Sequence, residues 1–123
     1  GSVALFDNGA QRGWYGDLAP AELAEQDFSR GVEYVIDEDN MTVQIVWQFD
    51  ADKQIYTSIT GDIDYLPNDH YVLAFAGTSP VPDNPRVMEV DRAGNVLFNA
   101  VSNRGQIEYR VEKIDLYAGL QGF

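Results

Sequence analysis

The chain has no cysteine, which excludes disulfide bonds and thiolate metal sites. It has a single histidine, His70, and only 8 Lys and Arg against 20 Asp and Glu, so its formal net charge is −12. Such a negative field repels phosphate backbones, and we expect no nucleic-acid partner. No apolar run approaches the roughly 20 residues that a bilayer-spanning helix needs, so we also expect no membrane partner.

The apolar content is sufficient for a packed core. The 123 residues are 45% hydrophobic and include seven Tyr, six Phe and two Trp. Eight stretches rich in β-branched or aromatic residues, bounded by Gly, Pro, Asn or Asp, predict strands. They span residues 3–7, 32–37, 42–49, 56–66, 71–77, 86–91, 96–102 and 108–117.

The connections predict antiparallel pairing of neighbouring strands. Residues 38–40 (Glu-Asp-Asn), 67–69 (Pro-Asn-Asp) and 92–94 (Arg-Ala-Gly) tolerate the backbone angles of tight turns. Residues 19–28 contain Pro20 followed by good helix formers, so we expect one short helix inside a long loop. The fold class is therefore all-β.

The spacing of the strands predicts antiparallel four-stranded blades of a partial β-propeller, one full blade plus parts of two neighbours. Residues 56–102 would form the complete blade. Residues 1–49 would form a partial blade with an inserted loop at 8–30, and residues 108–117 the first strand of the next blade. Because Val3 begins a strand with no preceding turn, we expect the chain to start midway through a larger fold. The alternative for the same strands is a small β-sandwich or barrel.

A blade exposes two apolar faces, and each must be packed against another sheet. We therefore expect the remaining propeller blades of a longer protein as partners. A homodimer is a second way to cover these faces.

Several patches in order resemble the C-terminal propeller region of the bacterial arylsulfate sulfotransferases. The early ones are Leu-Phe-Asp-Asn-Gly at 5–9 with Arg-Gly at 12–13, Val-Glu-Tyr at 32–34, the strand at 42–49, and Tyr-Thr-Ser-Ile-Thr-Gly at 56–61. The later ones lie at 86–91, 94–98 and 109–117. Each motif is weak alone, and their order over nearly the whole chain carries the resemblance.

The resemblance implies a six-bladed propeller with an N-terminal β-sandwich, secreted to the periplasm. It implies transfer of a sulfuryl group from a phenolic sulfate ester to a phenol, without a phosphoadenylyl sulfate donor or other cofactor. It also implies a histidine that is transiently sulfated, in ping-pong nucleophilic catalysis. That histidine would lie upstream of Gly1, so this chain alone would be inactive. We expect His70 to be an exposed residue at a hairpin tip.

Sulfuryl transfer places charge on equatorial oxygens, which fixed hydrogen-bond donors must stabilise. Three residues are candidates for binding the substrate: Asn8, Thr60 and Arg110. Asn8 follows a predicted strand and could instead form an Asx turn. Thr60 could be an ordinary strand residue, and Arg110 could pair with the glutamates two positions away on either side.

Other readings of the residues are open. Asp62 and Asp64 share a predicted strand face, and paired carboxylates are typical of glycoside hydrolysis. The acidic stretch at 37–40 offers hard ligands for calcium but lacks the calcium-loop pattern, so we expect a solvated hairpin and no metal site. A non-catalytic scaffold could also bind a protein or glycan through the loop at 8–30.

Overall fold

The computed structural model describes residues 1–9, 28–76, 84–103 and 108–115, and within these ranges the chain is all-β. Strands β1 (Ser2–Asp7), β2 (Arg30–Asp37) and β3 (Thr42–Phe49) form one antiparallel sheet in chain order. Strands β4 (Asp62–Leu66), β5 (His70–Phe75), β6 (Arg86–Asp91) and β7 (Val96–Val101) form the second. A short 3₁₀ turn, η1 (Ala51–Lys53), follows β3.

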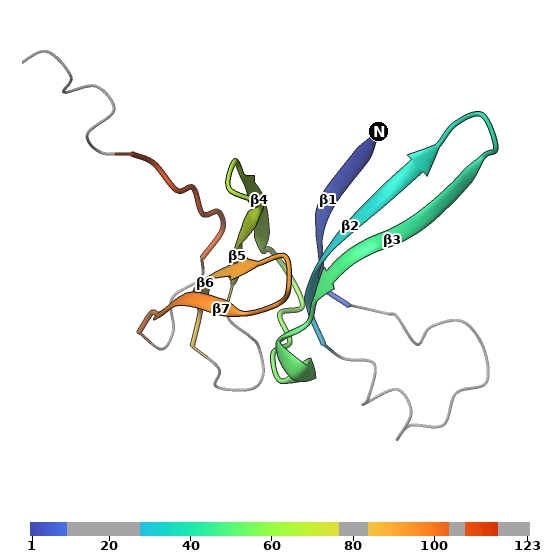
Figure 1. The fold of residues 1–123 in the computed structure, drawn as a ribbon. Coiled ribbons are helices and arrows are strands. Elements are labelled where there is room, and N and C mark those ends of the chain that lie inside the picture. Colours follow the sequence, from blue (N-terminus) through green and yellow to red (C-terminus); the bar gives the residue numbers. More distant parts are fainter. Residues whose placement is uncertain (10–27, 77–83, 104–107, 116–123) are drawn as a thin grey trace, which may run out of the picture.

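Neither sheet closes on itself, so the strands do not form a barrel. The two sheets meet along β1 and β4 and diverge away from that junction (Figure 1). This open arrangement is compatible with part of a propeller.

The three predicted hairpin turns are confirmed, and aspartates hold two of them. Asp37 accepts hydrogen bonds from the backbone and side-chain nitrogens of Asn40. Asp91 accepts the same pair of bonds from Asn95. In each turn the asparagine side-chain bond is the main reason why the pKa of the aspartate lies below its ordinary value. The acidic stretch at 37–40 is thus an exposed turn stabilised by its own side chains.

Two predicted strands differ from the structure. Only Asp62–Leu66 of the predicted strand 56–66 is extended in a ladder, because Thr60 and Gly61 have positive φ angles that interrupt it. Residues 108–115 are not assigned to a strand, and their contacts with the second sheet include bonds to the Asp62 and Glu89 side chains. Their assignment to a next blade stays a prediction. The predicted helix falls mostly on residues 10–27, which lie outside the described residues.

Aromatic side chains fill the junction between the sheets. Trp47 on β3 stacks on Tyr71 of β5 with ring centroids 3.7 Å apart, and Phe6 on β1 meets Phe75 of β5 edge-on at 5.3 Å. Gly31 allows the sheets to approach, because a Cβ atom there would lie 2.5 Å from a methyl group of Leu73. β5 is therefore buried along nearly its whole length, whereas every residue of β7 is exposed.

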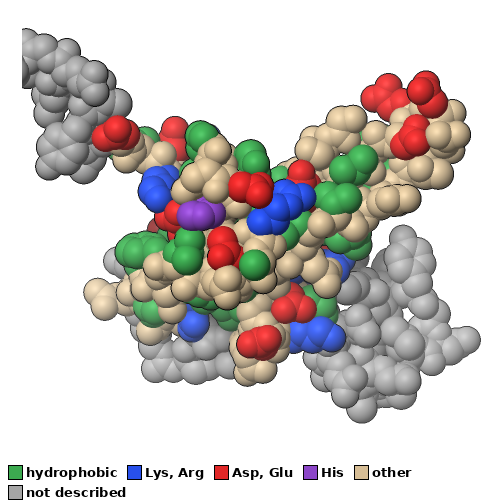
Figure 2. Space-filling view, viewed as in Figure 1, with side chains coloured by type: hydrophobic (Ala, Val, Ile, Leu, Met, Phe, Trp, Pro, Cys, Tyr) green, Lys and Arg blue, Asp and Glu red, His purple; other side chains and the backbone are tan. Residues whose placement is uncertain are grey.

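Large apolar side chains remain on the surface of both sheets, and Figure 2 shows them over each (green). On β3 and β7 they are Val43, Ile45, Val46, Val96, Leu97, Phe98 and Val101, all at least 43% exposed. Such extended apolar surface is typical of an interface with further protein.

The described part of the chain contains neither a helix with the length and apolar character required to cross a bilayer nor a cluster of three or more potential metal-ligating side chains.

Candidate functional site

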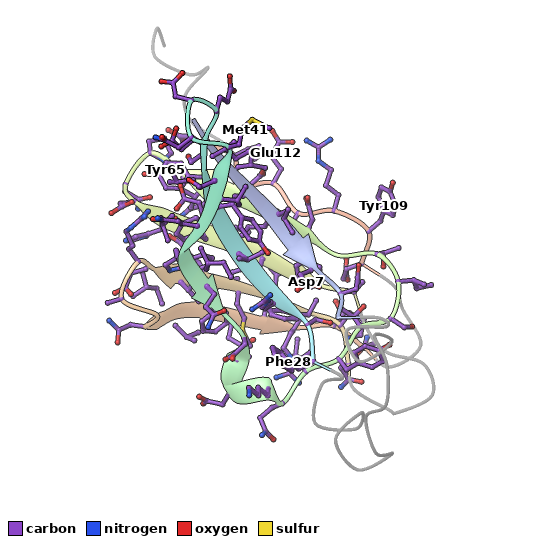
Figure 3. The ribbon with its side chains drawn as sticks, turned by 90° about the vertical axis from the view of Figure 1, so that its right-hand side faces the viewer. Asp7, Phe28, Met41, Tyr65, Tyr109 and Glu112 are labelled. Atoms are coloured by element: carbon purple, nitrogen blue, oxygen red, sulfur yellow. The ribbon has the colours of Figure 1, made fainter. Side chains whose placement is uncertain are left out.

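Three segments that are distant in sequence meet at one end of the junction: the end of β1, the start of β2 and the loop before β4. Figure 3 shows this end, with Asp7 and Phe28 on it and Met41 at the opposite end of the strands. The side-chain amide of Asn8 donates hydrogen bonds to the backbone carbonyls of Thr57, at 2.8 Å, and Thr60. Both N–H bonds of this amide are thus committed within the chain.

Ser29 forms the second connection between these segments and is fully buried. Its hydroxyl accepts from the Thr57 backbone N–H at 2.8 Å and points its proton at the carbonyls of Asn8, at 2.8 Å, and Thr57, at 3.2 Å. Its backbone N–H donates to the Ile55 carbonyl at 2.8 Å. We call Asn8, Ser29, Thr57 and Thr60 the loop-end cluster. All four side chains are neutral.

The backbone of this loop is in an unusual conformation. Thr60 has φ 59°, in the left-handed region that a β-branched residue avoids. A residue held there costs about 1–3 kcal/mol and persists only where its surroundings fix it. Gly61 follows with φ 124°, and the ring of Phe6 occupies the space where a Cβ would be, 2.3 Å away at its nearest atom. Only glycine fits this position.

Residues 108–111 complete the site. The Thr60 hydroxyl points to the Glu108 carbonyl at 3.5 Å, the upper limit for a hydrogen bond. The Asp62 carboxylate accepts from the Val111 backbone N–H at 3.1 Å, and the Arg110 Nε lies 3.9 Å from the same oxygen. Arg110 is 68% exposed, so its guanidinium remains largely in solvent.

The three residues selected from the sequence therefore lie in one connected region. Asp7 forms an Asx turn, accepting from the Gly9 backbone N–H at 2.9 Å. The Asx turn considered for Asn8 would use the N–H of residue 10, which lies outside the described residues. Arg110 pairs with Asp62 and not with its neighbouring glutamates. Asp62 is thus engaged by residues 110–111, while Asp64 lies two residues further along β4.

Sequence reasoning missed Ser29 and Gly61. The signal for Gly61 was a glycine inside a predicted strand, which indicates a bend or a close contact. Ser29 had no comparable signal, because its partner Thr57 lies 28 residues away.

A second polar cluster lies toward the hairpin end of the same junction. We call Glu33, Asp69, Tyr71 and Arg92 the hairpin-end cluster. The Tyr71 hydroxyl donates to Glu33 at 2.6 Å, and Arg92 lies 3.1 Å from the same carboxylate oxygen. Arg92 also lies 3.4 Å from Asp69. This cluster, unlike the other, contains formal charges.

These contacts shift two pKa values in opposite directions. The hydrogen bond from Tyr71 is the main reason why the pKa of Glu33 lies below its ordinary value. Burial, followed by the bond to Glu33, raises the pKa of Tyr71 well above that of a free phenol. The pair is therefore a carboxylate bound by a neutral phenol.

His70 differs from its prediction. It opens β5 with a side chain that is only 23% exposed, and its Nδ1 lies 2.9 Å from Glu89. Lys113 contacts the other oxygen of Glu89 at 2.6 Å, and this bond, ahead of that from His70, lowers the pKa of Glu89. In the β4–β5 ladder His70 lies opposite Leu66, which is four residues along β4 from Asp62. By strand rise, Leu66 and Asp62 are about 13 Å apart. The histidine is thus remote from the loop-end cluster.

The fold and the loop-end cluster define the described part of the chain as an all-β structure, with a site of neutral side chains where its two open sheets meet. The model of the family described as arylsulfotransferase (ASST) matches residues 1–111, and the chain belongs to this family.

Curated relatives agree with the family. The chain is 38% identical over 80 residues to the arylsulfate sulfotransferase AssT of Lelliottia amnigena and 35% identical over 80 residues to that of Escherichia coli O6:H1. Each match covers 63% of this chain and 13% of the relative. The chain thus matches about an eighth of the length of these bacterial enzymes.

Proposed function

We propose that this chain is part of an arylsulfate sulfotransferase that moves a sulfuryl group from a phenolic sulfate ester to a phenol, and that its loop-end cluster borders the substrate. The observation that carries the proposal is that Thr60, within a family match over residues 1–111, is held in a strained conformation. Strain of this kind gathers at functional sites, where a side chain must be presented in one orientation.

Thr60 and Arg110 are the groups that would bind the sulfate oxygens. The 3.5 Å contact of the Thr60 hydroxyl with Glu108 is weak, so its proton is available to an anionic oxygen, a stronger acceptor. Arg110 supplies a positive charge in a chain of net charge −12, and its exposed guanidinium could form two parallel bonds to a sulfate. Such donors stabilise the charge that develops on the transferring group.

The nucleophile would be a histidine in the part of the protein that precedes Gly1, since His70 lies about 13 Å along β4 from the Asp62 end, by strand rise. Its imidazole nitrogen would attack sulfur and the S–O bond to the phenol would break, releasing the phenol and leaving a sulfohistidine. The acceptor phenol, on losing its proton, would then attack sulfur and restore the histidine. No phosphoadenylyl sulfate or other cofactor enters this scheme, and the 123 residues alone would be inactive.

Further sheets of the longer protein would cover the exposed apolar faces of β3 and β7. In this proposal they are the other blades of a β-propeller, and a homodimer is the alternative cover. The periplasm is the proposed compartment, on the resemblance to secreted sulfotransferases.

The test uses the full-length protein with 4-nitrophenyl sulfate as donor and a phenol as acceptor. We expect release of 4-nitrophenol with formation of the sulfated acceptor, and a histidine that gains one SO₃ group when donor alone is supplied, read by peptide mass spectrometry. Thr60→Ala should lower kcat about 100-fold, the cost of removing one donor to a developing oxyanion. Arg110→Met should lower kcat/KM by about tenfold.

Thr42→Ala is the matched control, because Thr42 is an exposed threonine at the start of β3, by the opposite turn. We expect it to retain full activity. Equal activity of the Thr60 and Thr42 variants would contradict the role of Thr60. An absence of transfer by the unmodified protein would contradict the function itself.

A further inference from the structure

We infer that Asn8 is a positioning residue, which acts on the substrate only through Thr60. The inference rests on the proposed function, because it assumes that the Thr60 hydroxyl meets the sulfuryl group. It gives Asn8 a role different from that of a donor to the substrate.

The geometry of the Asn8 side chain supports this role. One amide nitrogen, at the end of β1, donates to the carbonyls of both Thr57 and Thr60, and so closes the loop between them. Because an amide nitrogen has two hydrogens, these bonds use its whole donor capacity. Asn8 therefore has no N–H left for a sulfate oxygen while the loop keeps this shape.

The two bonds from Asn8 also oppose the backbone strain at Thr60. Thr60 would leave its left-handed conformation if its surroundings allowed it, because its branched side chain crowds the backbone there. Rotating that residue would move its carbonyl away from Asn8 and, with it, the hydroxyl away from Glu108. Asn8 thus fixes the direction in which the Thr60 hydroxyl points.

Asn8 is itself held in place by Ser29. Its carbonyl accepts from the buried hydroxyl of Ser29 at 2.8 Å, and the same hydroxyl accepts from the Thr57 N–H. The backbone on both sides of the loop is therefore held through one buried group. Because Ser29 restricts the motion of Asn8, the Asn8 side chain can hold the loop in one conformation.

The experiment is a double-mutant cycle in the full-length protein, assayed with 4-nitrophenyl sulfate. Asn8→Ala should lower kcat ten- to a hundredfold with KM changed less than about threefold, because misplacement of a donor weakens the transition state most. In the Thr60→Ala background, Asn8→Ala should lower kcat less than about twofold. Asn8→Asp should lower kcat as much as Asn8→Ala does, since a carboxylate has no proton to donate to the carbonyls of Thr57 and Thr60.

Rescue provides a readout that general loss of structure would not give. Thr60→Ser keeps the hydroxyl and removes the methyl group that crowds the left-handed backbone. In that background Asn8→Ala should therefore lower kcat several-fold less than it does in the unmodified protein. Asn8→Asp is nearly isosteric and serves where the alanine variant does not fold. A crystal structure of the Asn8→Asp protein should show Thr60 outside the left-handed region.

The outcomes separate the two claims. If Thr60→Ala is impaired but Asn8→Ala is fully active, or loses as much in the Thr60→Ala background as in the unmodified protein, the positioning role is overturned and the proposed function stands. If Thr60→Ala is fully active, the proposed role of Thr60 fails, and the positioning role fails with it. An unchanged Thr60 conformation in the Asn8→Asp structure overturns the positioning role whatever the rates.

Discussion

The two polar clusters at the junction of the sheets solve the same packing problem with different chemistry. The hairpin-end cluster satisfies a buried phenol with a carboxylate and an arginine, as Glu33, Tyr71 and Arg92 contact one another. The loop-end cluster uses neutral groups, and its side chains bond to backbone carbonyls and N–H groups. One cluster joins side chains, and the other fixes a backbone.

The difference indicates what each cluster is for. In the hairpin-end cluster compensated charges hold two sheets together, and its one left-handed residue, Asp69 at φ 63°, lies in a tight turn where aspartate tolerates this conformation. The loop-end cluster instead maintains Thr60 and Gly61 at positive φ, a conformation that stability alone does not require. We therefore expect variants of the first cluster to change stability with little effect on transfer, and variants of the second to change both.

The largest effect is expected for Gly61→Ala. The new methyl would meet the ring of Phe6 and the residue would be strained at φ 124°, so the cost should be about 3–5 kcal/mol, the sum of overpacking and backbone strain. Sulfuryl transfer should be lost at temperatures where the protein is still folded. Thermal unfolding followed by circular dichroism, with the 4-nitrophenol assay, measures both.

Gly94→Ala separates the two causes. Gly94 has φ 89° but no atom within 4 Å of a new Cβ, so only the backbone strain applies, about 1–2 kcal/mol. Its turn contributes no residue to the loop-end cluster, and transfer should persist. Equal destabilisation by the two variants would show that the contact with Phe6 has no energetic weight.

A medium effect is expected for Tyr71→Phe at the hairpin end. It removes the hydroxyl bonded to Glu33 and to Arg92 and should destabilise the protein by about 1–2 kcal/mol, with kcat for transfer unchanged. Hydrogen exchange of the amides in β4 and β5 would locate the loss. A large fall in kcat without any change in stability would contradict the division of roles between the clusters.

Tyr65→Phe is the matched control. Tyr65 also donates to a carboxylate, that of Asp69, at 2.9 Å, and its ring meets that of Tyr71 edge-on. Since its side chain is 54% exposed, water replaces the lost bond, and the cost should stay below about 0.5 kcal/mol.

Prediction from the sequence succeeded where local rules decide. Aspartate and asparagine in the turns at 37–40 and 91–95 determine the hairpins, and stretches rich in β-branched and aromatic residues determine the strands that these turns join. The loop before β4 was predicted as strand because Thr57, Ile59 and Thr60 favour strands locally. Its actual shape depends on Asn8 and Ser29, 49 and 28 residues away from Thr57, and no local pattern records such bonds.

The candidate site was predictable only in part for the same reason. Thr60 and Arg110 were selected as donors for a sulfate, and the structure adds what orients them, namely a left-handed backbone and the Asp62 carboxylate. The expected pairing of Arg110 with glutamates two positions away assumed a regular strand. Residues 108–115 have no such ladder, so Arg110 reaches across to β4 instead.

The smallest predicted effect concerns pH at the hairpin end. Because its folded pKa is lowered, chiefly by Tyr71, Glu33 stabilises the fold above its unfolded pKa of about 4.3, and this contribution is lost as the pH falls through the folded value. The raised pKa of Tyr71 keeps the phenol neutral throughout that range. Tyr71→Phe removes the main cause of the Glu33 shift, so its stability should fall less steeply on acidification than that of the unmodified protein.

The measurement compares the free energies of unfolding of the two proteins from about pH 7 to pH 3. The gap between them should be widest near neutral pH and narrow by about 1 kcal/mol or less in acid, where Glu33 is protonated in both. Glu89, whose pKa is lowered mainly by its hydrogen bond from Lys113, is present in both proteins and contributes equally to their loss of stability in acid. A gap that stays constant with pH would mean that the Tyr71 hydroxyl stabilises the junction without favouring the ionised form of Glu33, through its bond from Arg92 instead.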